Sequence, residues 1–286
     1  MQFNTILVPV DFTVNTRVAI EKAIAICDGP NPAIHVIHVP EPTSVFGNYR
    51  IFFTDGHYAD EREDSRLQLR LKECLLYISK LRSDITTCYW ISYSTSVERA
   101  IKEKAVDIAA DLIIIGKNSR HSVLPFLNTV VPSRLSKSTG ISVLTVKPGA
   151  LSSHVKTVVV PISPKHPEKK VAVINGLGNK FHLHIRLLLL VEKDDDPQTL
   201  QNSLLNMCRM LKYRALDTIS YEVLYAGNRN WGILRYSRSV EADLLIVNPE
   251  TETKIGWFNK HISDELPVNS KTQVLAVGRR VLSLAK

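Results

Sequence analysis

The sequence predicts an α/β protein made of two related parallel-sheet domains. Short runs rich in isoleucine and valine alternate with segments whose apolar residues recur at helical spacing, and this alternation is typical of a parallel sheet covered by helices. Three of the apolar runs return in the second half of the chain in the same order. The chain has 286 residues. That length leaves about 143 residues for each copy, which is a common domain size.

Five apolar runs predict the strands of the first half. Each run has the length and the β-branched composition of a strand that is buried on both faces. The segments between the runs carry apolar residues three and four positions apart, as at Ile20, Ala23 and Ile24, and these predict helices. The predicted strands are Thr5–Val10, Ala33–Val39, Thr87–Tyr93, Leu112–Gly116 and Ser142–Val146.

The second half repeats the order of the first. VVVPI at 158–162 matches ILVPV at 6–10, ADLLIVN at 242–248 matches ADLIIIG at 110–116, and QVLAV at 273–277 matches SVLTV at 142–146. The matches lie 152, 132 and 131 residues apart, which indicates a duplication with extra residues early in the first copy. We predict a first domain over 1–150 and a divergent second domain over 151–286. The extra residues fall around 41–64, which we expect to form a surface lid or contact loop.

Composition argues against a membrane protein and against a metal site. No apolar run approaches the roughly 18–20 residues that a membrane-spanning helix needs. The amino-terminal segment lacks the features of a signal peptide, so a cytoplasmic location is predicted. Four cysteines are scattered without any CxxC pair, which favours reduced thiols over a zinc site or a disulfide framework.

The net charge of +8 raises the question of a polyanionic partner. Residues 1–148 carry 17 basic and 15 acidic side chains, a balance of +2, and residues 149–286 carry 19 and 13, a balance of +6. The excess is dispersed and is not interleaved with aromatic residues, which argues against nucleic acid and favours solvated helix faces. Binding of a polyanion through the second domain stays an alternative.

Sequence motifs give no sign of catalysis. The chain contains no GxSxG, HExxH or GxxxxGK[ST] motif, and no GxGxxG opens the first domain. We therefore expect no enzyme and assign no catalytic residue. Asp11 is the most interesting carboxylate, because ligands of parallel α/β sheets bind at the carboxyl ends of the strands. Its alternative role is to cap the helix that follows.

Three segments resemble the universal stress protein family, and the duplication resembles its tandem two-domain members. The segments are ILVPVDFTVNTRVAIEKAIAI near the start, ADLIIIG at 110–116 and ISVLTVKP at 141–148. The resemblance covers the whole chain and is stronger over 1–150. It implies an adenine nucleotide alpha hydrolase-like fold with two doubly wound parallel five-stranded sheets. It also implies that these sheets pack as an internal pseudo-dimer through the strands near Val143 and Val274.

Some members of that family bind ATP through a Gly, two residues, Gly, nine residues, Gly, Ser/Thr loop after the fourth strand. Glycines let backbone amides surround the phosphates, and the hydroxyl adds a hydrogen bond. An Asp after the first strand and a Val after the second hold the ribose and adenine. Asp11, Val39 and Gly116 match this pattern, whereas Ser119 and Thr129 replace the later glycines.

The phosphate half of the pattern is therefore eroded, although Lys117, Ser119 and Arg120 still offer donors to an anion. The candidate nucleotide-binding residues are Asp11, Val39, Gly116, Ser119, Arg120 and Thr129. In the second domain Ser163 and Asn248 stand at the Asp and first Gly positions. Glu250 and Glu252 follow there and would repel phosphate, so no nucleotide site is expected.

The resulting expectation is a tandem universal stress protein that acts as a non-enzymatic stress-response binding or regulatory module. Its first domain would hold a degenerate site for ATP or a related adenine nucleotide. One alternative is an ATP-binding switch with weak hydrolysis in the first domain, and the other is the polyanion-binding module. A homo-oligomer or a protein partner stays open.

Overall fold

A computed structural model gives the arrangement of the chain. It describes residues 2–40, 61–117, 130–151, 154–163, 167–193, 195–212, 218–225, 227–252, 254–255, 260–267 and 269–279. Of the connection expected over 41–64, residues 61–64 begin a helix, and 41–60 lie outside the described residues. None of the described helices is long and apolar enough to span a membrane.

Strands and helices alternate along both halves of the chain. The N-terminal half contains β1 (Thr5–Pro9), α1 (Val14–Ile26), β2 (Ala33–His38), α2 (Glu61–Leu81), β3 (Thr86–Ile91), α3 (Val97–Asp107), β4 (Leu112–Gly116), α4 (Pro132–Thr139) and β5 (Ser142–Val146). The short 3₁₀ helix η2 (Pro148–Ala150) follows. The C-terminal half contains β6 (Thr157–Pro161), α5 (Pro167–Gly178), β7 (His184–Val191), α6 (Pro197–Lys212), β8 (Thr218–Tyr225), α7 (Arg229–Ser239), β9 (Leu244–Val247), β10 (Lys254–Ile255), β11 (Lys260–His261), α8 (Ile262–Glu265) and β12 (Gln273–Ala276).

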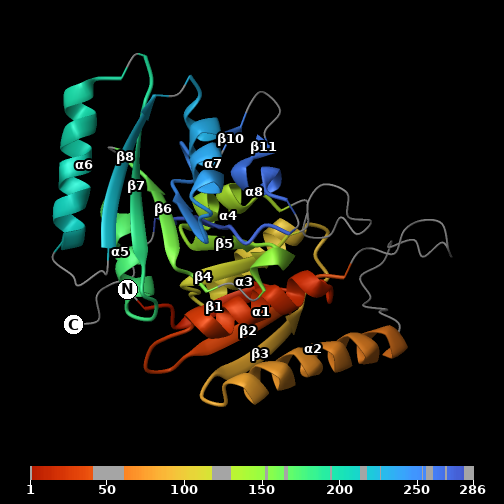
Figure 1. Cartoon of the computed structure of the whole chain (residues 1–286). Helices are drawn as coiled ribbons and strands as arrows, with labels where there is room; N and C mark the ends of the chain where they lie inside the picture. Colours follow the sequence, from red (N-terminus) through yellow and green to blue (C-terminus); the bar gives the residue numbers. More distant parts are fainter. Residues whose placement is uncertain are drawn as a thin grey trace.

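One ten-stranded sheet runs through both halves in the order β3-β2-β1-β4-β5-β12-β9-β6-β7-β8 (Figure 1). Neighbouring strands are parallel within each half. At the centre β5 and β12 pair antiparallel, with Val143 opposite Ala276 and Thr145 opposite Val274. The predicted doubly wound α/β class is confirmed, and so is the pairing of the halves through these strands. The two five-stranded sheets form one continuous sheet, whereas the domain boundary at 150/151 stays a prediction.

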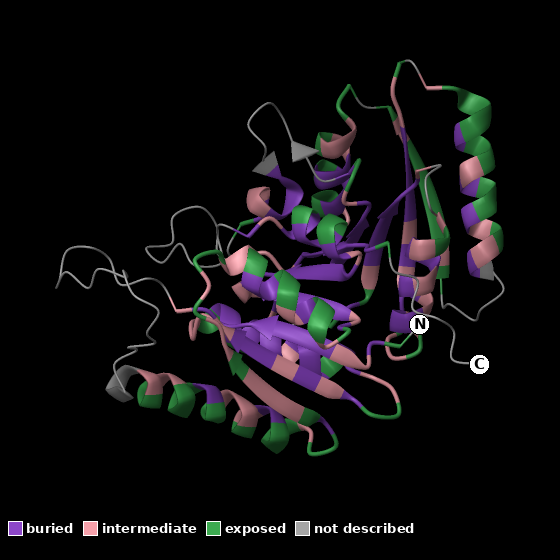
Figure 2. Cartoon of the chain, turned by 180° about the vertical axis from the view of Figure 1, so that it is seen from behind, coloured by how far each residue is buried: buried purple, intermediate pink, exposed green. Residues whose placement is uncertain are grey.

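Side-chain alternation along the strands builds separate cores on the two faces of the sheet. On one face a single core continues across both halves and includes Leu144 of β5 and Leu275 of β12. On the other face each half has its own core, one around Ile113 and Val143 and one around Leu245 and Val274. The central strands are therefore buried throughout, whereas β8 at one end of the sheet is largely exposed (Figure 2).

The repeated ADL segments have the same structural role in both halves. The Asp111 carboxylate accepts hydrogen bonds from the backbone N–H groups of Asn4 (2.9 Å) and Thr5 (2.8 Å) at the start of β1. Asp243 accepts equivalent bonds from Lys156 (3.1 Å) and Thr157 (2.8 Å) at the start of β6. Burial raises the pKa of Asp111, although both bonds favour its charged form.

The turns before β4 and β9 are also alike. Ala109 and Glu241, the second residue before each Asp, both adopt a left-handed backbone with φ 49°. A left-handed conformation is uncommon for residues other than glycine. Its recurrence at matching positions supports the duplication that the sequence predicts.

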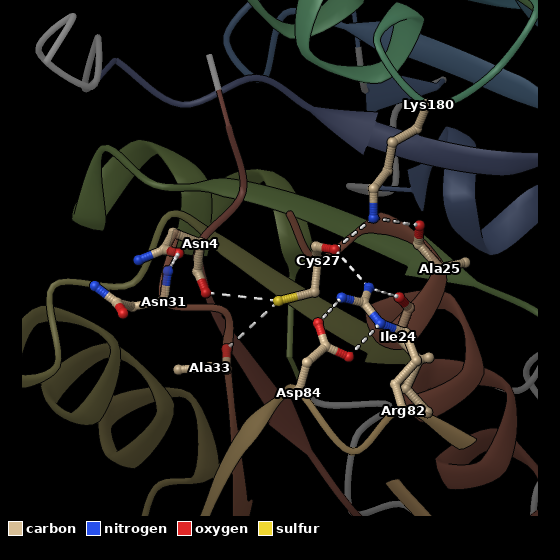
Figure 3. A network of polar contacts seen from close by, with 9 residues as sticks. All are labelled: Asn4, Ile24, Ala25, Cys27, Asn31, Ala33, Arg82, Asp84 and Lys180. Atoms are coloured by element: carbon tan, nitrogen blue, oxygen red, sulfur yellow. Dashed lines mark hydrogen bonds and ion pairs between the residues drawn. The ribbon is translucent and has the colours of Figure 1, made fainter. Parts of the chain in front are cut away.

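The halves also touch at the edge of the sheet where the strands begin (Figure 3). Lys180, after α5, donates hydrogen bonds to the carbonyl oxygens of Ala25 (3.3 Å) and Cys27 at the end of α1. Arg82, which pairs with Asp84, donates to the Cys27 carbonyl as well (2.9 Å). Cationic side chains at the carboxyl end of a helix donate hydrogen bonds to its last carbonyl oxygens and interact favourably with the negative end of its dipole. These contacts fix α1 against the C-terminal half.

Candidate functional site

The described candidate residues of the N-terminal half lie at the carboxyl ends of three adjacent strands. Asp11 follows β1 by two residues, Val39 follows β2, and Gly116 ends β4. This edge is where parallel α/β sheets bind ligands. The other candidates, Ser119, Arg120 and Thr129, lie outside the described residues.

The Asp11 carboxylate is bonded to the start of α1. Its Oδ1 accepts hydrogen bonds from the Thr13 backbone N–H (3.0 Å), the Thr13 hydroxyl (2.6 Å) and the Thr16 hydroxyl (2.9 Å). The Thr16 hydroxyl in turn accepts from the N–H groups of Asp11 and Phe12, and the Thr13 hydroxyl caps α1 by accepting from the Asn15 N–H. These bonds support the capping role, which holds the connection from β1 to α1 in place.

Close packing of β4 against α1 requires a glycine at position 116. A methyl group added to its Cα would lie 2.3 Å from the Asn15 carbonyl oxygen and 2.8 Å from the Asn15 Cβ. Only glycine lets β4 approach the helix start so closely. Val39 likewise has a structural place, because its side chain is buried in the core around Ile113.

Beside Asp11 lies an aromatic group that the sequence analysis missed. Phe12 has a left-handed backbone (φ 59°), and its ring lies 4.6 Å from the His38 ring, centroid to centroid. The Arg70 guanidinium lies 4.1 Å from the Phe12 ring centroid. Burial lowers the pKa of His38, whereas its bond to the Val10 carbonyl (2.8 Å) opposes that shift. Left-handed phenylalanine is a strained conformation that often marks a functional site.

Lys117, which was expected to offer a donor to an anion, is instead turned toward the C-terminal half. Its buried ammonium lies 2.8 Å from Asp264 Oδ1 and donates to the Val130 carbonyl (3.2 Å). Asp264 belongs to α8, and its second oxygen accepts from the His261 N–H (3.4 Å). The residue after Gly116 therefore joins the two halves.

Ser133 and Lys147 complete this contact. The Ser133 hydroxyl lies 3.1 Å from His261 Nδ1. Lys147 follows β5, and burial lowers its pKa to about 8, with Lys117 adding to that shift and Asp264 opposing it. We call Lys117, Ser133, Lys147, His261 and Asp264 the inter-half polar cluster.

In the C-terminal half a buried ion pair occupies the corresponding edge. The Lys170 ammonium on α5 lies 2.9 and 2.6 Å from the two carboxylate oxygens of Glu252 and donates to the Pro161 carbonyl (2.6 Å). Glu252 also accepts from the backbone N–H of Asn248 (2.7 Å), the counterpart of Gly116. Lys170 is only 3% exposed and Glu252 1%. Burial lowers the pKa of Lys170, and Glu252 opposes that shift.

Comparison with known proteins identifies the family. The model of the universal stress protein family matches residues 2–147, about half of the chain. The chain belongs to the universal stress protein family. No curated protein matches its sequence.

Solved structures show that the fold of this universal stress protein recurs over its whole length. A universal stress protein from Archaeoglobus fulgidus is 13% identical with a TM-score of 0.65, and the match covers 98% of this chain and 100% of that one. A protein of unknown function from Pseudomonas aeruginosa is 12% identical with a TM-score of 0.56, covering 97% and 93%. The cytoplasmic domain of a prokaryotic cation chloride cotransporter is 10% identical with a TM-score of 0.56, covering 97% and 96%.

The family match ends at residue 147, at the end of β5. The C-terminal half repeats the strand order of the N-terminal half, yet Asn248 beside the buried Lys170–Glu252 pair stands where the N-terminal half has Gly116. The two halves therefore differ at the carboxyl edge of their strands.

Proposed function

We propose that this universal stress protein is a non-enzymatic binding and regulatory module with an eroded adenine nucleotide site in its N-terminal half and none in its C-terminal half. The buried Lys170–Glu252 pair is the observation that carries the proposal. Glu252 takes the hydrogen bonds of Lys170 and the Asn248 N–H, which are the groups that an anion would need there. A phosphate would have to displace a carboxylate already bonded on both oxygens.

The N-terminal half supports the same proposal through the bonding of its candidate residues. Asp11 bonds to the helix start, Val39 is buried in the core, and Gly116 packs on Asn15. These structural roles account for the residues that match the ATP-binding pattern. We expect the affinity for ATP to be millimolar or weaker, which corresponds to a binding free energy no more favourable than about −4 kcal/mol.

Calorimetric titration of the full chain with ATP and magnesium tests the proposal, together with a mass measurement of the protein as purified. We expect no saturable heat at micromolar ATP and no copurified nucleotide. Stoichiometric ATP, or micromolar binding that Asp11→Asn weakens, would instead support the ATP-binding switch with weak hydrolysis. Gly116→Trp is unsuitable as a probe because the contact with Asn15 leaves no room for a side chain.

A second candidate is anion binding at the surface where α4 of the N-terminal half meets the C-terminal half. A shallow hollow there is lined by Lys137 from α4 together with Lys169, Lys170 and Arg279. Arg279 pairs with Glu250, which reduces its charge. Binding to a polyanion that persists at moderate salt and is weakened by Lys137→Ala would favour this function, whereas binding lost at moderate salt would reflect general charge only.

A further inference from the structure

Two buried polar atoms lie on one face of β5 at the seam between the halves. Lys147 Nζ and Thr145 Oγ1 have no hydrogen-bond partner in the described part of the chain. Lys147 is 1% exposed and Thr145 2%. Lys147 has an extended backbone (φ −119°, ψ 158°), so its side chain continues on the face of β5 that carries Thr145. Buried polar groups are normally bonded, and a buried charge without a partner is costly.

Two charged side chains act on the Lys147 ammonium. The Asp264 carboxylate attracts it, and the Lys117 ammonium repels it. Asp264 already pairs with Lys117 at 2.8 Å, and His261 faces Ser133. Two ammonium groups therefore share one carboxylate. With a pKa of about 8, Lys147 still carries its charge in most molecules at pH 7.

The neighbouring sequence does not offer a second carboxylate. The segment that begins after Lys117 and ends before Val130 reads NSRHSVLPFLNT, and the segment before β11 reads GWFN. Neither contains an aspartate or a glutamate. Compensation by a carboxylate would thus have to come from outside these segments.

We propose that the inter-half polar cluster, with Thr145, binds one small oxyanion of the phosphate or sulfate class. Lys147 offers three unused donors and Thr145 one on the same face of β5, and several donors suit an anion with several oxygen atoms better than a halide. The Asp264 side chain is 22% exposed, so the cluster reaches solvent beside α8. The site occurs once per chain, because Ala276 and Gly278 stand at the matching positions of the C-terminal half.

Phosphate binding to the full chain tests the proposal. In phosphate instead of chloride at equal ionic strength, Tm should rise by about 2–4 °C once phosphate exceeds its Kd severalfold. Equilibrium dialysis with labelled phosphate should give one phosphate per chain. Lys147→Met should abolish both responses, and Thr145→Val, of similar shape, should weaken binding severalfold.

Two control variants separate this site from its surroundings. Lys22→Met removes another buried lysine of the same half, on α1, and should keep the full phosphate response. Asp11→Asn alters the candidate nucleotide site and should keep it as well. ATP should bind no more tightly than phosphate, which distinguishes free phosphate from the phosphates of a nucleotide. The proposal is wrong if the parent shows no phosphate-specific shift, or if Lys147→Met retains it.

Discussion

The two halves of this protein share a backbone and differ at one edge of the sheet. Asp111 and Asp243 bond to the starts of β1 and β6 in the same way. At the carboxyl edge, by contrast, the N-terminal half has Gly116 packed on α1, whereas the C-terminal half has Asn248 beside a buried ion pair. The fold therefore depends on the strand starts and the cores, while the carboxyl edge tolerates opposite chemistries.

Breaking the buried pair should have the largest effect. Glu252→Ala leaves the Lys170 ammonium buried without its carboxylate and should lower the free energy of unfolding by about 3–5 kcal/mol. Urea unfolding of the full chain measures this loss in the free energy of unfolding. The double variant Lys170→Met, Glu252→Leu should recover most of the loss, because it removes both charges together. A single variant as stable as the parent would show that the pair does not hold this edge.

Lys147, whose matching position in the C-terminal half is Gly278, should make the stability of the protein depend on pH in the alkaline range. Its pKa is about 8 in the folded protein against an ordinary value of 10.5. Between these values the unfolded chain binds more protons, so stability rises with pH. In phosphate-free buffer the parent should gain about 3 kcal/mol relative to Lys147→Met from pH 8 to 10.5. Parallel stability curves for the two proteins would contradict this assignment.

Gly116→Ala should destabilise the N-terminal half by about 2 kcal/mol, because the new methyl group would overlap the Asn15 carbonyl. Asn248→Ala at the matching position should cost about 1 kcal/mol, since it removes only the bond from the Glu250 N–H to the Asn248 side chain. Thermal unfolding compares the two variants. Equal losses would mean that the close approach at Gly116 relaxes without strain.

The smallest difference between the halves is expected at the feature that they share. Asp111→Asn and Asp243→Asn should each cost about 1.5 kcal/mol, because each weakens two charge-assisted bonds to a strand start. Hydrogen exchange of the amides at residues 4–5 and 156–157 localises the change. A clear inequality between the variants, beyond what the Lys271 ammonium 3.7 Å from Asp243 accounts for, would show that the backbone is not equivalent in the two halves.

The sequence predicts the strands because short apolar runs rich in isoleucine and valine are typical of buried strands. It predicts the duplication because three of these runs recur in the same order. The pairing of β5 with β12 follows from the family resemblance. The repeated ADL segments are visible in the sequence as apolar matches, but nothing local indicates that their aspartates bond to β1 and β6. That contact joins residues more than 80 positions apart.

The carboxyl edge is harder to predict for the same reason. The sequence predicts only that Glu252 repels phosphate, whereas in the structure it is buried and bonded to Lys170 from a helix 82 residues earlier. Lys117 was expected to serve an anion, and its partner Asp264 comes from the other half. Residue types at this edge are visible in the sequence, but their pairing depends on how the two halves meet.

The antiparallel seam has a consequence for synthesis of the chain. β5 is buried at every residue, and its partner β12, the last of the described strands, begins 131 residues later. At ordinary rates of translation the interval is on the order of ten seconds. Throughout it, the apolar edge of β5 lacks its neighbour and resembles the open strand edges that recruit other chains. We therefore expect this edge to favour association with other chains until β12 is made, so that chaperones matter more for the yield of the protein than for its final stability.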